Sequence, residues 1–152
     1  MFNYKDIEEL YAYKHKTILS KSKKDIGDFY SEGIAYDVKS NNVLKQNYMP
    51  NLVSANKLYD FLSDSKNNLT LIFVDYKDTV IIRDKYVKIE NISWDCLSIQ
   101  CQGNGVIQLK GKLKIDEKQT REQFLNELSC QYIQNYIPKQ RKKLDFLEEK
   151  YV

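Results

Sequence analysis

The stretch KKDIGDFYSEGIAYDVKSNN, residues 23–42, decides how the rest of the chain is interpreted, because it predicts a β-hairpin that carries charged side chains. Two β-rich runs, IGDFYS and IAYDVKS, are separated by Glu32-Gly33. A glycine in a two-residue connection between such runs is a hairpin signal. With the turn at this dipeptide, pairing continues outward along both strands until Asp28 lies opposite Asp37.

This hairpin is expected to bring two carboxylates and Lys39 to one patch. Side chains on a strand alternate between faces, so Asp37 and Lys39 project on the same side and Val38 on the other. Like charges on directly opposed residues are destabilising. A hard divalent cation would offset the repulsion between the two carboxylates, since Mg²⁺ is commonly held by one or two carboxylates plus a substrate phosphate. Asp25 is a rival of Asp28 as the upstream acid, and an ordinary solvated hairpin is the alternative interpretation.

Length and composition are those of one soluble domain spanning residues 1–152. A chain of this length buries about two-thirds of the surface that its unfolded form exposes. No apolar run is long enough to cross a bilayer. The N-terminus, MFNYKDIEEL, has acids where a signal peptide would need a basic start and an apolar core. We therefore expect a cytoplasmic protein without a membrane association.

The supply of histidine and cysteine excludes several classes of enzyme. The single histidine, His15, argues against histidine-dependent nucleases, HEXXH hydrolases and Ser-His-Asp triads. The three cysteines, Cys96, Cys101 and Cys130, form no C-x-x-C pair, which disfavours a disulfide framework and a structural zinc site. Buried free thiols are expected instead.

Basic residues gather in two clusters, KHKTILSKSKK at 14–24 and PKQRKK at 138–143, although the net charge is only +3. Clusters of this kind suit contact with phosphate groups. Lys21, Lys23 and Lys24 are the candidate DNA-contacting residues of the first cluster. A solvated charged face is an equally good interpretation of these clusters from the sequence alone.

Hydrophobic periodicity predicts an α/β domain with a mixed central β-sheet flanked by α-helices. The stripe formed by Phe124, Leu128, Tyr132 and Tyr136 indicates a C-terminal helix that Pro138 ends or kinks. Helices are expected over 4–19, 50–64 and 116–137 and again after the proline, and strands over 26–31, 34–40, 69–76, 79–89, 96–102 and 106–115. These elements divide into an N-terminal helix and basic segment (1–24), a catalytic hairpin and sheet (25–115) and C-terminal helices (116–152).

The hairpin resembles the signature of the PD-(D/E)xK nucleases, in which an acid on one strand precedes acid-x-lysine on the next. YMPNLVSANKL (48–58), WDCLSIQCQ (94–102) and TREQFLNEL (120–128) look like the equivalent blocks, in the same order, of HincII-type restriction endonucleases in the EcoRV-like branch. The resemblance covers roughly residues 25–148. It implies a restriction-endonuclease-like fold and Mg²⁺-dependent hydrolysis of both strands of DNA at a short palindromic site, the activity of a type II site-specific deoxyribonuclease.

The resemblance also implies roles for individual residues. Asp28 and Asp37 would be the metal ligands, with the Val38 backbone carbonyl completing the set, and Lys39 would be the catalytic lysine. Lys39 would favour hydroxide formation or stabilise the negative charge that develops on the phosphate.

The DNA-contacting residues implied by the resemblance lie in the downstream blocks. Tyr48, Met49 and Asn51 match a loop that approaches DNA, and Tyr48 falls where the family can place a side chain between base pairs, where its ring would stack. Ser93 falls at a base-reading position.

The partners implied are double-stranded DNA and a second copy of the chain. A methyltransferase typically accompanies restriction enzymes, but nothing in this chain indicates one. The alternatives are a nicking, repair or junction-resolving nuclease on the same fold, or a DNA-binding relic that no longer cuts. The intact acids and lysine argue against a relic.

Overall fold

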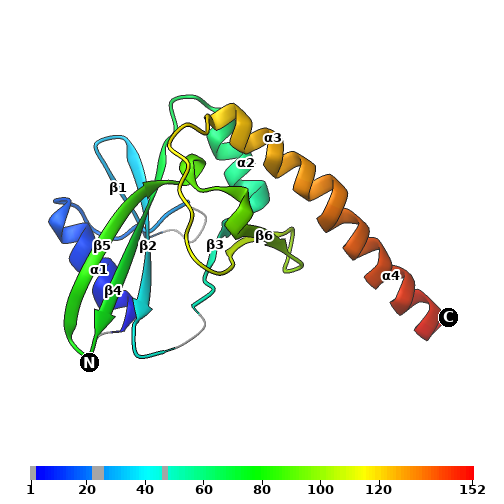
Figure 1. The fold of residues 1–152 in the computed structure, drawn as a ribbon, viewed down its shortest axis with the longest axis horizontal. Helices are drawn as coiled ribbons and strands as arrows, with labels where there is room; N and C mark the ends of the chain where they lie inside the picture. Colours follow the sequence, from blue (N-terminus) through cyan, green and yellow to red (C-terminus); the bar gives the residue numbers. More distant parts are fainter. Residues whose placement is uncertain (1–2, 22–25, 46–47) are drawn as a thin grey trace.

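The computed structural model describes residues 3–21, 26–45 and 48–152 and has a mixed α/β architecture (Figure 1). A mixed four-stranded sheet has the order β1-β2-β4-β5 and an antiparallel three-stranded sheet the order β3-β7-β6. The strands are β1 Phe29–Ser31, β2 Ile34–Asn42, β3 Asn51–Ser54, β4 Leu69–Lys77, β5 Val80–Lys88, β6 Leu97–Gln100 and β7 Val106–Leu109. The helices are α1 Tyr4–Lys14, α2 Ala55–Ser63, α3 Arg121–Gln131 and α4 Ile137–Tyr151, with 3-10 turns η1 Ile89–Asn91 and η2 Trp94–Cys96 and a π-helical segment η3 Tyr132–Tyr136.

The predicted hairpin is confirmed, with its turn at Glu32-Gly33. Phe29 pairs with Tyr36 and Ser31 with Ile34. Both turn residues adopt left-handed backbone angles, with φ of 50° at Glu32 and 80° at Gly33. Positive φ at both central residues is the geometry of a type I′ turn, whose twist matches that of the flanking strands. The register on which the interpretation of the two acids depends is therefore set by this turn.

β2 and β4 form the centre of the larger sheet, where they run parallel. The run at 69–76 was expected to be a strand buried on both faces, and β4 confirms this. Its odd-numbered Leu69 and Leu71 belong to one hydrophobic cluster. Its even-numbered Ile72 and Val74 belong to another. Only a strand covered on both sides can bury alternate residues in two clusters.

Different elements cover the two faces of this sheet. α1 packs against one face, where Ile7 and Tyr11 are buried together with Val38. The other face meets the main hydrophobic cluster, to which the small sheet, α2 and α3 contribute. Because side chains alternate along β2, Asp37 and Lys39 lie on the side of the main cluster while Val38 lies under α1.

The interpretation of residues 50–64 as one helix was wrong in its first part. Residues 51–54 form β3, which pairs with β7. The helix α2 begins only at Ala55, where the Ser54 side chain accepts a hydrogen bond from the backbone N–H of Lys57 and caps it. Pro50 therefore precedes a strand, and serine rather than proline marks the start of the helix.

Three other predicted boundaries also differ. α1 ends at Lys14 instead of continuing to residue 19, and Lys16 has a left-handed φ of 58°. β7 ends at Leu109, so that most of 110–115 lies outside the ladder. The helix expected from 116 begins at Arg121, where Thr120 and Gln123 form a capping box. At the end of α1 a left-handed backbone angle, and at the start of α3 a capping box, overrode the hydrophobic pattern.

The predicted C-terminal stripe is confirmed, because Phe124, Leu128 and Tyr136 are buried. Pro138 does not end the helical stretch. The π-helical segment η3 lies just before it, and the proline occupies the first turn of α4, where its missing N–H costs least. Of the three cysteines, Cys96 alone is buried, Cys101 is partly exposed and Cys130 is exposed, so the expectation of buried thiols was correct for one.

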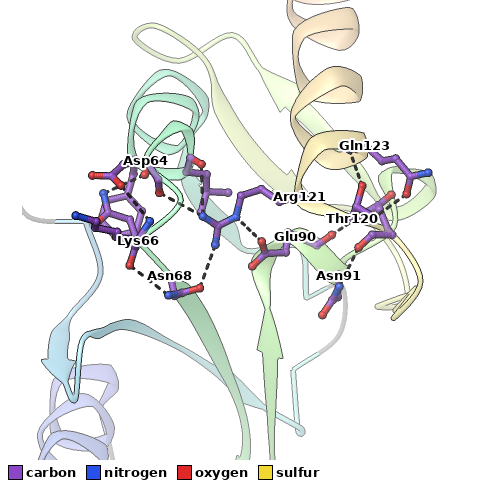
Figure 2. A network of polar contacts seen from close by, with 12 residues as sticks. Asp64, Lys66, Asn68, Glu90, Asn91, Thr120, Arg121 and Gln123 are labelled. Carbon is purple, nitrogen blue, oxygen red and sulfur yellow. Dashed lines mark hydrogen bonds and ion pairs between the residues drawn. The ribbon is translucent and has the colours of Figure 1, made fainter.

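An ion pair ties α3 to the rest of the domain (Figure 2). Arg121 Nε donates to Glu90 Oε2 at 2.6 Å. The same guanidinium donates to the carbonyls of Leu62 in the last turn of α2 and of Asp64 just after it, and to the side chain of Asn68. One residue thus connects α3, η1 and the chain that enters β4. No helix in the described ranges is long and apolar enough to cross a membrane.

Candidate active site

Asp28 is held against the edge of β2, just before β1 begins. Its backbone N–H donates to the Tyr36 carbonyl at 2.6 Å. Its Oδ2 accepts a 2.7 Å hydrogen bond from the N–H of Val38. The preceding Gly27 has φ of 85°, and a Cβ there would lie 2.8 Å from the Tyr36 carbonyl oxygen. Only glycine allows the chain to pass this close, so Gly27 contributes to the position of Asp28.

Asp37 lies beside Asp28 and is almost buried, with 9% of its surface exposed. Its Oδ2 lies 3.3 Å from Lys39 Nζ. The structure therefore brings together the three residues that the sequence selected. As expected from strand alternation, the lysine and the acid that lie two residues apart on β2 point to the same side.

The Val38 carbonyl lies on the same edge of β2 as the Asp28 carboxylate. In a strand, the N–H and C=O of one residue point to the same side. The N–H of Val38 points toward Asp28. Its carbonyl therefore faces this edge as well, beyond the first residue of β1, Phe29, which pairs with Tyr36. The carbonyl remains a predicted ligand, and its direction is compatible with that role.

Sequence reasoning missed a third acid, Glu8 of α1. Burial and the adjacent Asp28 carboxylate raise the pKa of Glu8 to about 7, and the two side chains share a hydrogen bond. Glu8 comes directly after the buried Ile7 and three residues before the buried Tyr11. A glutamate at the margin of the buried face of a helix was the available signal, but only the packing of α1 on the sheet shows which residues it approaches.

The acids line a cavity of about 580 Å³ whose rim is basic. Glu8, Asp28 and Asp37 line it together with residues of β3. Its lysines come from three separate segments: Lys5 of α1, Lys21 after α1 and Lys57 of α2. A hollow with carboxylates inside and ammonium groups around them can accept a cation and an anionic group together.

Burial makes the Asp37 carboxylate costly to ionise. The pKa of Asp37 is raised to about 8, chiefly by desolvation, with Lys39 opposing the shift and the neighbouring Asp28 adding to it. Carboxyl groups that are packed so closely cannot all carry a negative charge without a compensating cation. Perturbed carboxyls in a cleft are typical of functional sites, although structural clusters produce them too.

The donor set suits a divalent cation that is held only in part by the protein. In the described part of the chain, no three His, Cys, Asp or Glu side chains form a group that could hold a metal ion by themselves. Asp28 contacts both Glu8 and Asp37 and lies between them. Two carboxylates, with water and a substrate phosphate as further ligands, are the common arrangement for Mg²⁺. The residues present therefore fit Mg²⁺.

The candidate DNA-contacting loop lies beside this region. Met49 and Asn51 are exposed. Asn51 Nδ2 contacts Gln102 Oε1 at 3.4 Å. Tyr48 differs from the expectation of a side chain free to enter DNA, because its hydroxyl is buried without a hydrogen-bond partner. Burial and the negative charges of Asp75 and Asp37 raise its pKa. Insertion between base pairs would first require Tyr48 to leave this position.

The remaining predicted residues are not gathered at the cavity. The hydroxyl of Ser93 accepts a hydrogen bond from the Asp95 N–H and caps η2, and Ser93 is not among the residues that line the cavity. Lys21 does line it. Lys23, Lys24 and the rival acid Asp25 lie outside the described residues.

Two comparisons with known proteins found no relative: no protein-family model matches the chain, and no curated protein matches its sequence.

Proposed function

We propose that this protein is a Mg²⁺-dependent endonuclease that hydrolyses phosphodiester bonds in double-stranded DNA, of the type II site-specific class. The observation that carries the proposal is the convergence of Asp28, Asp37 and Lys39: both acids line a cavity with a lysine rim, and Lys39 forms an ion pair with Asp37. The order of these residues, an acid just before β1 and acid-x-lysine on the partner strand β2, resembles that of the PD-(D/E)xK nucleases.

The side chains have distinct roles in this proposal. Asp28 and Asp37 would hold Mg²⁺, which when bound polarises the phosphate and lowers the pKa of water. Lys39 is kept beside Asp37 by their ion pair. From there its ammonium group stabilises the negative charge that develops on the phosphate oxygens. Glu8 shares a hydrogen bond with Asp28 and helps to orient it.

The lysine rim favours a polyanionic substrate. Lys5, Lys21 and Lys57 come from segments that are far apart in the sequence, yet they line one cavity. Each can neutralise one phosphate of a bound strand, which contributes affinity without sequence preference.

A nicking enzyme is the second candidate, because one chain carries a single site of this kind among its described residues. One site cuts one strand. A double-strand break therefore requires two copies of the chain or two successive events. The ratio of nicked to linear plasmid early in a digest distinguishes the two activities, and sequencing of the product ends identifies the site and any stagger.

The test is a supercoiled plasmid digest with Mg²⁺, with EDTA as the metal-free control. Asp37→Asn and Lys39→Ala are expected to reduce the initial cleavage rate at least about 100-fold, in line with the loss of one stabilising group at a reacting centre. Fluorescence anisotropy with Ca²⁺ in place of Mg²⁺ measures DNA binding separately, which both variants should largely retain.

Asp60→Asn is the matched control, since Asp60 is an exposed acid on α2. It should leave cleavage unchanged. Full cleavage by Asp37→Asn or Lys39→Ala would overturn the assignment. Binding without any Mg²⁺-dependent cleavage by the wild-type protein would instead identify a non-cutting DNA-binding protein.

A further inference from the structure

The helix α4 projects away from the rest of the domain as the end of a long helical stretch (Figure 1). None of its residues is buried. Leu144, Phe146 and Leu147 are all exposed, the first two with 64% and 66% of their surface in contact with solvent. Exposed apolar side chains gain stability when they are covered, at about 25 cal/mol per Å² of apolar surface buried.

Most of the apolar residues of this stretch follow a heptad pattern. The spacing alternates between four and three residues from η3 to the end of α4, and one position, Gln140, is polar. This is the a/d seam of a two-helix coiled coil. Its members are Ile133, Ile137, Gln140, Leu144, Leu147 and Tyr151. Ile137 packs partly against the main core, and the positions available for pairing along the exposed part of the helix are Gln140, Leu144, Leu147 and Tyr151.

The charges of α4 change sign along its length. Lys139, Arg141, Lys142 and Lys143 lie in its first half, whereas its second half carries Asp145, Glu148 and Glu149 and a single basic residue, Lys150. The helix is thus complementary in charge to a copy of itself in the opposite direction. A two-fold axis brings the same helix surface of two copies into contact with the helices in opposite directions.

We propose that α4 is a dimerisation helix, which pairs antiparallel with α4 of a second copy of this chain. Leu144 of one copy packs against Leu147 of the partner subunit, and the two-fold axis passes between the two contacts. This register places Arg141 beside Glu148 of the partner subunit. It also places Lys143 beside Lys150 of the partner subunit, an unfavourable pair that the two-fold axis repeats. The proposal does not depend on the nuclease assignment.

The other occupant to consider is DNA, since the first half of α4 is basic. Contact with phosphates would explain the four basic residues, but phosphates would not cover the apolar side chains of Leu144 and Leu147. The apolar seam and the acidic second half together favour a second copy. A coiled coil of this length is short, so the dimer is expected to dissociate on dilution, with the monomer dominant at the lowest concentrations.

Sedimentation equilibrium of the full chain over a range of concentrations tests the proposal. The wild-type protein is expected to show a monomer–dimer equilibrium. Leu144→Gln/Leu147→Gln should shift the dissociation constant upward at least about 100-fold, because two pairs of seam residues lose their apolar contact. Phe146→Gln is the matched control: it removes a similarly exposed apolar side chain from the same helix outside the seam, and it should leave the equilibrium unchanged.

A charge exchange tests the antiparallel direction. Arg141→Glu and Glu148→Arg should each weaken the dimer, because each places two like charges side by side. The double variant should restore it, because the positive and negative charges then exchange positions across the interface. Lys143→Glu should strengthen it. Circular dichroism verifies that every variant keeps the wild-type fold. A wild-type monomer at all concentrations, a dimer indifferent to the leucine pair, or a double variant as weak as the single ones would each overturn the proposal.

Discussion

The N–H of Val38 donates a 2.7 Å hydrogen bond to Oδ2 of Asp28, so the strand that carries the acid-x-lysine sequence also positions the first acid. A hydrogen bond to a carboxylate is shorter and stronger than one between neutral groups. It aligns the Asp28 side chain along the edge of β2 and beside Asp37. The hairpin thus supplies both carboxylates, and a backbone contact keeps them together despite their mutual repulsion.

Replacement of Gly27 by alanine is expected to displace Asp28. The added Cβ would meet the Tyr36 carbonyl at 2.8 Å, and alanine tolerates the φ of 85° poorly. We expect a loss of stability of about 2 kcal/mol or more. The initial rate of Mg²⁺-dependent DNA cleavage should fall as well. Urea unfolding and the plasmid digest measure the two effects.

Gly33→Ala is the control for this prediction. Gly33 has a similar φ of 80°, but an added Cβ would meet nothing within 4 Å. Its replacement should cost only the backbone strain, about 1 kcal/mol, and should leave cleavage nearly unchanged. Equal losses of activity in the two variants would show that the close approach at Gly27 does not position Asp28.

Glu8→Gln is expected to raise the Mg²⁺ concentration needed for half-maximal cleavage by about 10-fold, the lower end of the range for residues behind metal ligands. The amide keeps the shape of Glu8 but removes the negative charge that acts on Asp28. A Mg²⁺ titration of the initial cleavage rate measures this. Glu9→Gln, which changes an exposed neighbour on the same helix, should have no effect. A Glu8→Gln titration identical to wild type would remove Glu8 from the site.

The metal-free protein is expected to lose stability as the pH rises from about 4 to about 8. The pKa of Asp37 is raised from 3.8 to about 8 in the folded protein, chiefly by burial. The folded state therefore retains a proton that the unfolded chain releases, so this contribution is full below pH 4 and is lost as the pH passes through the folded pKa. The raised pKa of Glu8 acts in the same direction up to about 7.

Asp37→Asn isolates this contribution, since the amide does not ionise. Urea unfolding in EDTA should show that the variant has the shallower decline of stability between pH 5 and pH 8. At pH 8 it should be more stable than the wild type. Asp60→Asn, at an exposed position, should follow the wild-type curve. A parallel pH dependence in wild type and Asp37→Asn would contradict the inferred shift.

Arg121→Ala is expected to destabilise the domain by about 3 kcal/mol or more, because it leaves the Glu90 carboxylate buried without its partner. Arg83→Ala offers the comparison. Arg83 forms an equally short ion pair with Asp75, but its side chain is mostly exposed. Solvent screens such a pair, so its loss should cost at most about 1 kcal/mol. Urea unfolding of both variants checks the difference, and equal losses would contradict it.

Local sequence patterns were sufficient to predict the hairpin and the proximity of Asp28, Asp37 and Lys39. Glu32-Gly33 determines the turn, the turn determines the register, and strand alternation then places Asp37 and Lys39 on one side. These steps involve only residues close in sequence, for which backbone geometry leaves few choices. The apolar run of β4 and the buried stripe of α3 were predictable for the same reason.

The tertiary structure alone decided which residues distant in the sequence lie near Asp28, Asp37 and Lys39. Glu8, Lys5 and Lys57 reach the cavity because α1 and α2 pack beside the hairpin, and no spacing in the sequence encodes that approach. Residues 51–54 became a strand because β7 was there to pair with them. The high pKa of Asp37 arises chiefly from its burial in the folded protein. Sequence determines short-range geometry, whereas long-range packing determines solvent exposure, and with it the charge of the site.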